Sequence, residues 1–297
     1  MHKILIVTQR LSPIPGVGKN RIENIINQLS TSNHIDILIL KSSFEPFIIK
    51  NYFKNIRNIY RFPYPEIYYN LDDGVRSKTD LVKLLRLVYN KTLRWKFLYI
   101  FEFFFKRFIK ETFNNKNYSL IISTSPHPIV NIYAEILSDI LKIKWIADVR
   151  DPYDRYHLKE AGYRAMKSAD LITATTKTLA DIIEEQTCRK KIAVLSNGHN
   201  LKKDSIKKLQ NINLLHDNIN IFYGGSTQSL HRIRILKKLI NSLSLDDRVK
   251  LYIATTTPLY KSEAPKNIIQ LGYLKKDNYL SYIAKCDYSI NITEPDD

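Results

Sequence analysis

The sequence predicts an α/β protein built from two doubly wound domains. Short apolar runs rich in β-branched residues recur along the chain, and stretches with helical spacing of apolar residues separate them. This alternation is typical of parallel sheets whose two faces are covered by helices. A polar, lysine-rich stretch over residues 199–218 divides the alternation into two series. We therefore expect one domain over residues 1–200 and a second, incomplete one over residues 201–297, because the chain ends soon after the last predicted strand.

The first strand–helix–strand unit occupies residues 3–40. The runs KILIVT (3–8) and HIDILIL (34–40) are predicted strands. Between them, four apolar residues recur at helical spacing: Ile22, Ile25, Ile26 and Leu29. A unit of this size predicts two parallel strands joined by a helix.

The remaining elements follow from the same two patterns. Residues 41–117 mix basic and aromatic residues without a clean period, apart from a long helix predicted over residues 80–113. Further strands are predicted at 118–124, 143–151, 170–175, 191–198, 219–225, 248–255, 267–272 and 287–293. Further helices are predicted at 129–141, 176–187, 230–243 and 276–285, and one more helix is predicted to end near Ser168.

The turn after the first strand invites comparison with an ATP-binding loop. In VTQRLSPIPGVGKNRIENII (7–26), the pair Gly18-Lys19 follows a strand and precedes a helical pattern. The ATP-binding pattern G-x-x-x-x-G-K-[ST] requires glycine where this chain has Pro13, and serine or threonine where it has Asn20. Proline has a fixed φ and offers no N–H to a phosphate. The sequence therefore argues against this kind of triphosphatase and leaves a strand, a glycine-containing turn and a helix beginning near Lys19.

The chain is strongly basic, with a net charge of +17 and a pI near 9.6. Such a balance fits a polyanionic partner, which would be nucleic acid, anionic lipid or a phosphate-bearing substrate. The same charge balance is equally compatible with a chain that is simply rich in lysine, asparagine and isoleucine and whose charged side chains are solvated. Nucleic acid is not an expected partner, because the sequence carries no nucleic-acid-binding motif beside the charge.

The cysteine and hydropathy patterns predict a cytoplasmic protein. Cys188 and Cys286 are far apart and lie beside no histidine ligand pattern, so neither a disulfide framework nor a metal site is expected. The apolar run at the N-terminus is shorter than that of a signal peptide. No stretch reaches the roughly 18 uncharged apolar residues of a membrane span.

Several segments resemble the GT-B-fold glycosyltransferases, specifically those of family 4. LIISTSPHPIVNIYAEIL followed by IKWIADVRDPY is similar to two paired segments of that family, and SADLITATTKTLADII is similar to the strand and helix that follow. VLSNG is similar to the end of the first domain, and NIIQLGYLKKDNYLSYIAKCDYSINIT to the middle of the second. Each segment is moderately specific, and their order and spacing carry the resemblance. It runs from Met1 to Thr293 and is weakest over residues 41–117.

The resemblance implies a retaining transferase that moves a sugar from a nucleotide-sugar donor to a saccharide or lipid-linked acceptor in bacterial polysaccharide or glycoconjugate assembly. It implies no cofactor and no obligatory metal. Ligands of doubly wound sheets sit beyond the carboxyl ends of the strands, and the leaving diphosphate needs backbone N–H groups, helix N-termini or cations. The implied donor-binding residues are Gly16, Gly18, Gly224, Gly225, Arg232, Gly272 and Tyr273. For Gly272 and Tyr273, a purely structural place in the core or in a turn is an equal alternative to donor binding.

The resemblance also implies catalytic roles for His127, Arg150 and Asp151. His127 matches a histidine near the reacting sugar, where an imidazole hydrogen-bonds a hydroxyl or shuttles a proton. Its alternative is a turn residue between two prolines. Arg150 and Asp151 would orient the acceptor or a phosphate, and their alternative is a structural ion pair.

The chain departs from the family pattern in the second domain. Ser226 and His231 occupy the places of an arginine and a lysine, so Arg232 becomes the candidate phosphate-binding cation. The glutamate-bearing segment that holds the donor in the family would follow Asp297. These departures keep two other functions open, a non-catalytic binding subunit and a nucleotide-sugar epimerase.

Two interpretations fit the aromatic and basic helix predicted over residues 80–113. In the first, its aromatic residues enter a membrane interface while its cations meet anionic lipid, as a peripheral contact at the inner face of the cell membrane. In the second, the aromatic residues pack onto the sheet of the first domain and the cations are solvated. The residues concerned are Trp95, Phe97, Phe101, Phe104, Phe105 and Phe108, with Lys91, Arg94, Lys96, Lys106, Arg107 and Lys110.

Overall fold

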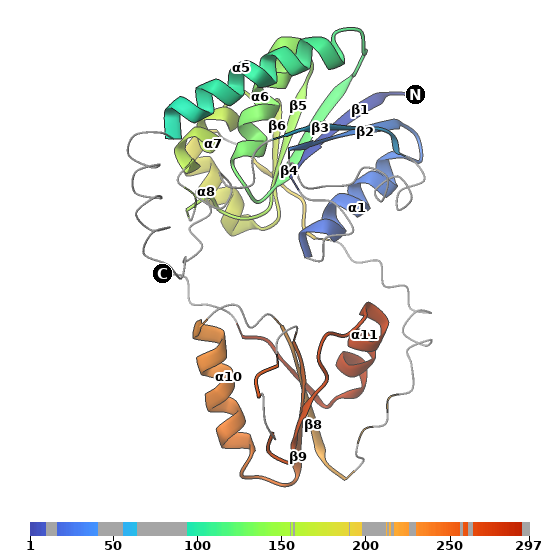
Figure 1. Ribbon diagram of the computed structural model, residues 1–297, viewed down its shortest axis with the longest axis vertical. Helices are drawn as coiled ribbons and strands as arrows, with labels where there is room; N and C mark the ends of the chain where they lie inside the picture. The colour runs from blue at the N-terminus through green and yellow to red at the C-terminus, as the bar shows by residue number, and fades with distance from the viewer. Residues whose placement is uncertain are drawn as a thin grey trace. The chain divides into compact units, whose positions relative to one another are not determined.

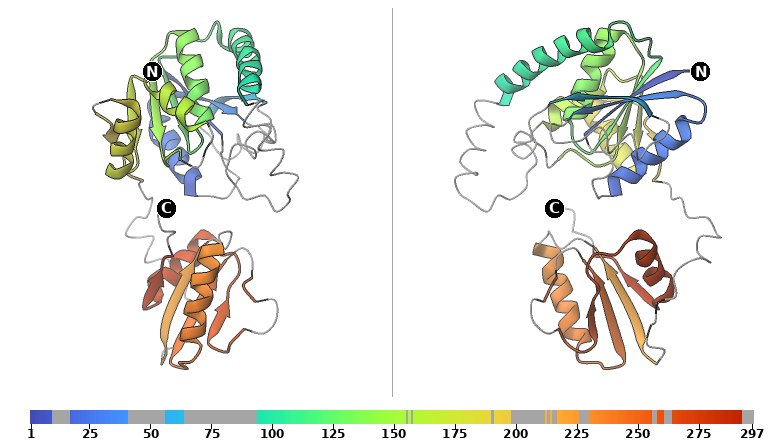
Figure 2. Two further views of the ribbon diagram at one scale, coloured as in Figure 1. Left: turned by 90° about the vertical axis from the view of Figure 1, so that its left-hand side faces the viewer. Right: turned by 45° about the vertical axis from the view of Figure 1, so that its right-hand side comes forward.

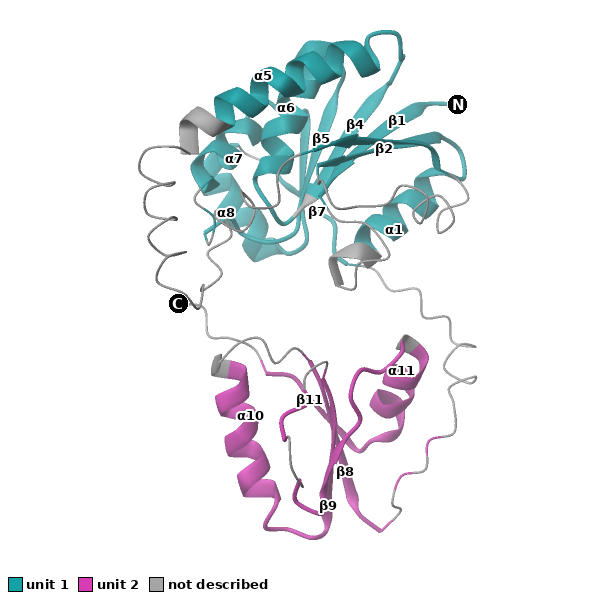
Figure 3. Ribbon diagram, viewed as in Figure 1, with its two compact units in different colours: residues 1–198 teal, residues 199–297 magenta. Residues whose placement is uncertain are grey.

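The structure, a computed structural model, divides the chain into two compact units, Met1–Gly198 and His199–Asp297. We call them unit 1 and unit 2 and describe each by itself; Figure 3 shows them in teal and magenta. The structure describes residues 1–9, 17–40, 56–63, 94–154, 156, 158–189, 191–197, 212, 214, 217–225, 230–255, 258–260 and 264–292.

Unit 1 is built on a seven-stranded parallel sheet with the strand order β3-β2-β1-β4-β5-β6-β7 (Figure 1). All neighbouring strands run parallel. The chain builds the sheet outward from β1 on one side and outward from β4 on the other, so its direction across the sheet reverses between these two strands. The strands are β1 (Lys3–Thr8), β2 (His34–Leu40), β3 (Ile56–Phe62), β4 (Leu120–Ser125), β5 (Trp145–Val149), β6 (Leu171–Ala174) and β7 (Ala193–Val194).

Helices cover both faces of this sheet (Figure 2). Ile22 and Ile26 of α1 are fully buried against isoleucines of β1 and β2 on one face. The other helices of unit 1 contribute to a larger buried cluster on the opposite face. The described helices are α1 (Val17–Leu29), α5 (Arg94–Phe113), α6 (Ile129–Leu141), α7 (Lys159–Met166) and α8 (Lys177–Thr187).

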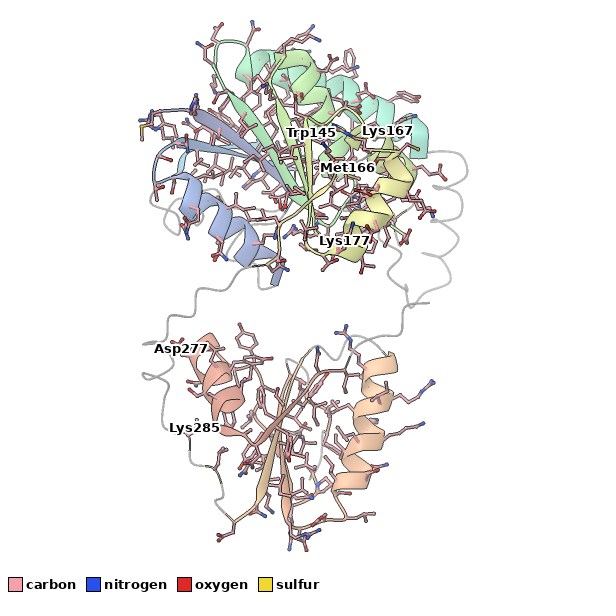
Figure 4. All side chains as sticks on the ribbon, turned by 180° about the vertical axis from the view of Figure 1, so that it is seen from behind. Trp145, Met166, Lys167, Lys177, Asp277 and Lys285 are labelled. Carbon is pink, nitrogen blue, oxygen red and sulfur yellow. The ribbon has the colours of Figure 1, made fainter. Side chains whose placement is uncertain are left out.

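Large aromatic side chains fill the cluster beneath α5, α6 and α7. Trp145 and Met166 are both fully buried in it (Figure 4). The ring of Phe105 in α5 meets that of Tyr133 in α6 edge to face, with centroids 4.4 Å apart. It meets the ring of Phe62 in β3 in the same way at 4.8 Å. Such pairs add roughly 0.5–1.5 kcal/mol to the stabilisation from burial, so α5 is anchored to the body of unit 1.

Unit 2 has a four-stranded parallel sheet with the order β10-β9-β8-β11. Leu236 and Ile240 of α10 are buried on one face. On the other face, Tyr279 and Tyr282 of α11 pack against the buried ring of Phe222. The elements are β8 (Ile219–Gly224), α10 (Leu230–Leu243), β9 (Val249–Ala254), β10 (Ile268–Gln270), α11 (Lys276–Lys285) and β11 (Tyr288–Ile290).

These sheets confirm the predicted fold class, an α/β protein with two doubly wound parallel sheets. One strand was not predicted. β3 forms an edge of the sheet, where Arg57 and Asn58 are exposed, and its sequence therefore lacks the apolar run of the central strands. Within the described residues, the helix predicted over 80–113 begins at Arg94. Among the helices that the structure describes, none combines the length and the apolar content that a membrane span requires.

A buried carboxylate, that of Asp148, joins three strands of unit 1 to helix α1. Asp148 in β5 is in register with Thr124 of β4 and Thr173 of β6. Both threonine hydroxyls donate to its carboxylate at 2.7 Å. Arg21 of α1 donates to the same carboxylate through Nε at 2.9 Å and through a terminal nitrogen at 2.6 Å. This two-point geometry is the strongest form of an arginine–carboxylate pair.

Arg21 extends the same network to the segment that follows β7. Its other terminal nitrogen donates to the carbonyl of Leu195 at 2.7 Å and to the side-chain oxygen of Asn197 at 3.2 Å. The side chains of Arg21 and Asp148 are only 6% and 3% exposed. Burial alone would raise the pKa of Asp148, but Arg21 and the two hydroxyls lower it below its ordinary value.

We expect the substitution Asp148→Asn to destabilise unit 1 by about 3–5 kcal/mol, because it leaves the buried charge of Arg21 uncompensated. Both tryptophans of the chain, Trp95 and Trp145, belong to unit 1, so urea unfolding followed by tryptophan fluorescence reports on this unit. The control is Asp139→Asn, which removes a carboxylate from an exposed pair with Lys142 and should hardly change the midpoint. Equal effects of the two substitutions would contradict the prediction.

The lowered pKa of Asp148 also predicts how stability depends on pH. Because the folded-state pKa lies below the unfolded-state value, the stabilisation is complete above the unfolded-state pKa and is lost as the pH falls through the folded-state value. Between about pH 5 and pH 3, the wild type should therefore lose more stability than the Asp148→Asn variant. The measurement is the difference in unfolding free energy between the two proteins at each pH, and a constant difference would argue against this account.

Candidate functional site

Each unit carries its candidate residues at the carboxyl-terminal edge of its sheet. The chain reverses its direction across the sheet between β1 and β4 in unit 1, and between β8 and β11 in unit 2. His127 follows β4, and Gly224 is the last residue of β8. In open α/β sheets, ligands bind beyond the strand ends at such reversal points. Each edge is therefore a candidate ligand-binding region of its own unit.

His127 is buried in the turn between β4 and α6, with 3% exposure. Its Nδ1 accepts a hydrogen bond from the backbone N–H of Ile129 at 3.2 Å, and its ring lies 4.6 Å from the ring of Tyr156, centroid to centroid. A neutral imidazole whose Nδ1 accepts a hydrogen bond carries its proton on Nε2. These contacts are those of a well-packed turn, and they also fix the ring and its tautomer.

A chain of buried polar contacts ties together the loops that follow β4 and β5. The indole Nε1 of Trp145 donates to the hydroxyl of Ser123 at 2.8 Å, and this hydroxyl donates to the side-chain oxygen of Asn131 at 2.7 Å. The Asn131 amide nitrogen donates in turn to the hydroxyl of Tyr153 at 2.8 Å. Tyr153 lies in the loop after β5 and Asn131 in the first turn of α6, so the two loops are held in one arrangement.

Gly162 lets helix α7 approach these two loops closely. A Cβ atom at this position would lie 2.5 Å from Cβ of Pro128 and 3.0 Å from the ring of Tyr153. Both distances are too short for a side chain to fit without a shift of the surrounding atoms. The turn that carries His127 is therefore supported from behind by α7.

The strand predicted over 143–151 ends earlier, at Val149, so Arg150 and Asp151 directly follow β5 instead of forming its last two residues. The backbone carbonyl of Arg150 accepts a hydrogen bond from the hydroxyl of Thr175 at 3.0 Å. Burial lowers the pKa of Arg150, and the charges of Asp148 and Asp151 partly offset that effect. Asp151 itself is exposed. The half-buried guanidinium thus adds positive charge near the end of β5, on the strand next to the one that precedes His127.

In unit 2, the space beside Gly224 and Gly225 is occupied by the protein's own tyrosines. A Cβ atom on Gly224 would lie 2.3 Å from the ring of Tyr279, whose hydroxyl donates to the Gly224 carbonyl at 3.2 Å. A Cβ atom on Gly225 would lie 2.8 Å from the hydroxyl of Tyr223. Close packing inside the unit therefore requires both glycines, whether or not a ligand also uses this space.

Arg232 lies in the first turn of α10, near the same strand end. Burial raises the pKa of the Tyr223 hydroxyl, and the positive charge of Arg232 opposes this effect. Arg232 is half-buried, whereas Arg234 on the same helix is exposed. The N-terminus of a helix attracts anions, so Arg232 and the start of α10 together favour negative charge beyond β8.

Gly272 and Tyr273 follow β10, two strands away from β8 in the sheet. Strand spacing puts them about 10 Å from the Gly224 region. Gly272 has a φ of +68°, a left-handed conformation that favours glycine, and the space around it is open. Tyr273 is 69% exposed. The backbone conformation, rather than packing, therefore explains the glycine at this position, and Tyr273 belongs to no core.

The other predicted features are less informative. Gly16 lies outside the described residues. Gly18 lies in the first turn of α1, which is described from Val17, two residues before the predicted start near Lys19. Among the residues that the structure describes, no group of three or more histidine, cysteine or acidic side chains could hold a metal ion.

Sequence reasoning missed three residues that shape these edges: Arg21, Asp148 and Tyr279. A signal existed for Asp148, since a carboxylate within the apolar run IKWIADV needs a partner once the strand is buried. The sequence does not name that partner, because Arg21 lies 127 residues away. Tyr279 carried no signal, since its role comes from the packing of α11 against β8.

No protein-family model matches this chain, and no curated protein sequence does. Solved structures with a similar fold include Anabaena Alr3699/HepE in complex with UDP, with a TM-score of 0.58 and 13% identity over 97% of this chain and 73% of that chain. MurG from Acinetobacter baumannii gives a TM-score of 0.51 and 12% identity over 97% and 71%. Arabidopsis thaliana UGT89C1 complexed with UDP-L-rhamnose gives a TM-score of 0.53 and 11% identity over 92% of this chain and 69% of that chain. At these identities the likeness concerns the fold, which matches the Rossmann-like domains of the GT-B class.

Proposed function

We propose that this protein transfers a sugar from a nucleotide-sugar donor to a saccharide or lipid-linked acceptor, in bacterial polysaccharide or glycoconjugate assembly. The observation that supports this most is the pair of doubly wound parallel sheets, each with candidate ligand-binding groups at its reversal point. Structures with a similar fold hold UDP-glucose in HepE and UDP-L-rhamnose in UGT89C1. We propose a cytoplasmic location for the reaction.

In this proposal unit 2 binds the donor. The diphosphate would lie beyond β8, where the start of α10 and the guanidinium of Arg232 offer positive charge. The backbone N–H of Gly225 already donates to the carbonyl of Ala254 at 3.2 Å. The nucleobase would lie at Gly272 and Tyr273, about 10 Å further along the sheet edge. That separation suits the distance between the base and the diphosphate of a nucleotide. Gly16 and Gly18 remain proposed donor-binding residues.

Unit 1 would bind the acceptor and supply the groups near the reacting sugar. His127 would hydrogen-bond a sugar hydroxyl or shuttle a proton, and the hydrogen bond from the Ile129 N–H to its Nδ1 would hold the ring in place. Arg150 and Asp151 would orient the acceptor or a phosphate. The reaction would retain the anomeric configuration and would need neither a cofactor nor an obligatory metal. Determining the anomeric configuration of the product tests the first point, and measuring activity in the presence of a chelator tests the need for a metal.

A thermal-shift screen of nucleotide-sugars tests donor binding. The correct donor at about 100 times its Kd should stabilise the native protein by about 2.7 kcal/mol. Arg232→Ala should weaken binding by roughly 10-fold to 100-fold, the range expected for a hydrogen bond to a charged group. Arg234→Ala is the matched control, because it removes an exposed arginine from the same helix. Equal affinities of the two variants would rule out the assigned role of Arg232.

A second test separates the role of His127 in the reaction from a role in the turn. If Nε2–H takes part in proton transfer, His127→Ala should lower turnover by about 10²-fold to 10⁴-fold while the donor-induced thermal shift persists. Unchanged turnover in a folded variant would leave His127 as a turn residue. Donor binding without transfer to any acceptor would indicate a binding subunit, and conversion of the donor sugar without an acceptor would indicate an epimerase.

A further inference from the structure

Helix α5 has two faces, and only one of them packs on unit 1. Its inner face consists of Leu98, Phe105, Ile109 and Phe113, all buried in the larger core cluster of unit 1. The outer face carries four large apolar residues with high exposed fractions. They are Tyr99 at 66%, Ile100 at 48%, Phe103 at 66% and Phe104 at 53%.

These four residues form one contiguous patch, which we call the outer α5 patch. Tyr99 and Phe103 are four residues apart, as are Ile100 and Phe104, so each pair stacks along the helix surface. The rings of Phe103 and Phe104 lie 5.8 Å apart, centroid to centroid. Single exposed apolar residues are common on soluble proteins, whereas a contiguous patch marks an interaction surface.

The helix that carries the patch is basic, which indicates what would cover it. α5 contains five basic and two acidic residues, and the whole chain has a net charge of +17. The three basic residues that follow the patch, Lys106, Arg107 and Lys110, are exposed. Both acidic residues are paired with bases, Glu102 with Lys106 at 2.6 Å and Glu111 with Arg107 at 2.7 Å.

We propose that the outer α5 patch docks this protein onto an anionic lipid bilayer, with α5 lying along the interface. Exposed aromatic residues followed by exposed cations are typical of helices that rest at headgroup depth. The aromatic rings would enter the boundary between headgroups and acyl chains, while the cations would meet anionic headgroups. A second copy of the chain is a less suitable occupant, because it would bring another basic helix against this one.

The inner face of α5 explains why docking would orient the whole of unit 1. Phe105 contacts Phe62 of β3 and Tyr133 of α6, so the helix cannot leave the sheet without disrupting the core. The patch is therefore a fixed surface and not a segment that must unfold to reach lipid. This inference does not depend on sugar transfer, since it can be tested without any donor or acceptor.

The test is cosedimentation of the full chain with phosphatidylcholine vesicles that do or do not contain phosphatidylglycerol. Wild-type protein should bind the anionic vesicles, and the double substitution Phe103→Ser/Phe104→Ser should weaken this binding by roughly tenfold or more. Leu245→Ser is the matched control, because Leu245 is a single apolar residue with 88% exposure in unit 2. Salt of about 1 M and the substitutions Arg107→Gln/Lys110→Gln should both weaken binding.

Three results would overturn the proposal. The first is undiminished binding of the Phe103→Ser/Phe104→Ser variant to anionic vesicles, which would assign binding to the general charge of the chain. The second is equal binding to vesicles with and without phosphatidylglycerol. The third is a wild-type dimer that this variant converts to a monomer in light scattering, which would make the patch a contact between copies. Unchanged urea unfolding of the variant checks that its fold is intact.

Discussion

Asp148 places a negative charge within the carboxyl-terminal edge of the unit 1 sheet, and Arg21 compensates that charge from helix α1. The pair is buried, so its attraction is screened little by water, and the threonine hydroxyls on both neighbouring strands complete the coordination of the carboxylate. One network thereby fixes α1 and the ends of three strands relative to one another. The candidate residues that follow β4 and β5 lie at this same edge, so their positions depend on it.

The two units hold the carboxyl-terminal ends of their strands in place with different kinds of side chain. Unit 1 orders its edge with buried polar contacts, in which Ser123 and Asn131 link Trp145 to Tyr153. Unit 2 orders the end of β8 by aromatic packing, because Tyr279 lies against Gly224. A glycine next to a candidate ligand site thus has two explanations in this protein. It admits a neighbouring ring at Gly224, and it permits a left-handed backbone at Gly272.

Helix α5 shows that the two interpretations of the basic aromatic region are compatible. Its inner aromatic residues pack onto the sheet, as the second interpretation expected, while the outer α5 patch remains exposed. The two sets alternate around the helix because of its period of about 3.6 residues. Composition alone could not divide them, since phenylalanine occurs in both. A rigid inner face is also what gives the outer face a defined orientation.

The sequence by itself determined the fold class and most of the strands and helices, because parallel strands buried on both faces leave apolar runs that local pattern reveals. It also placed His127 and Arg150 near the ends of two successive strands, since strand ends can be read from the chain, whereas the structure showed that these strands are neighbours in the sheet. Only the tertiary structure decided which groups meet: Arg21 with Asp148, Tyr279 with Gly224, and which aromatic residues of α5 are exposed. The tertiary structure was also needed to show that Ile56–Phe62 forms the edge strand β3. The physical reason is that a local pattern shows which residues tend to be buried but not which distant residue each one meets, because that depends on how the elements pack.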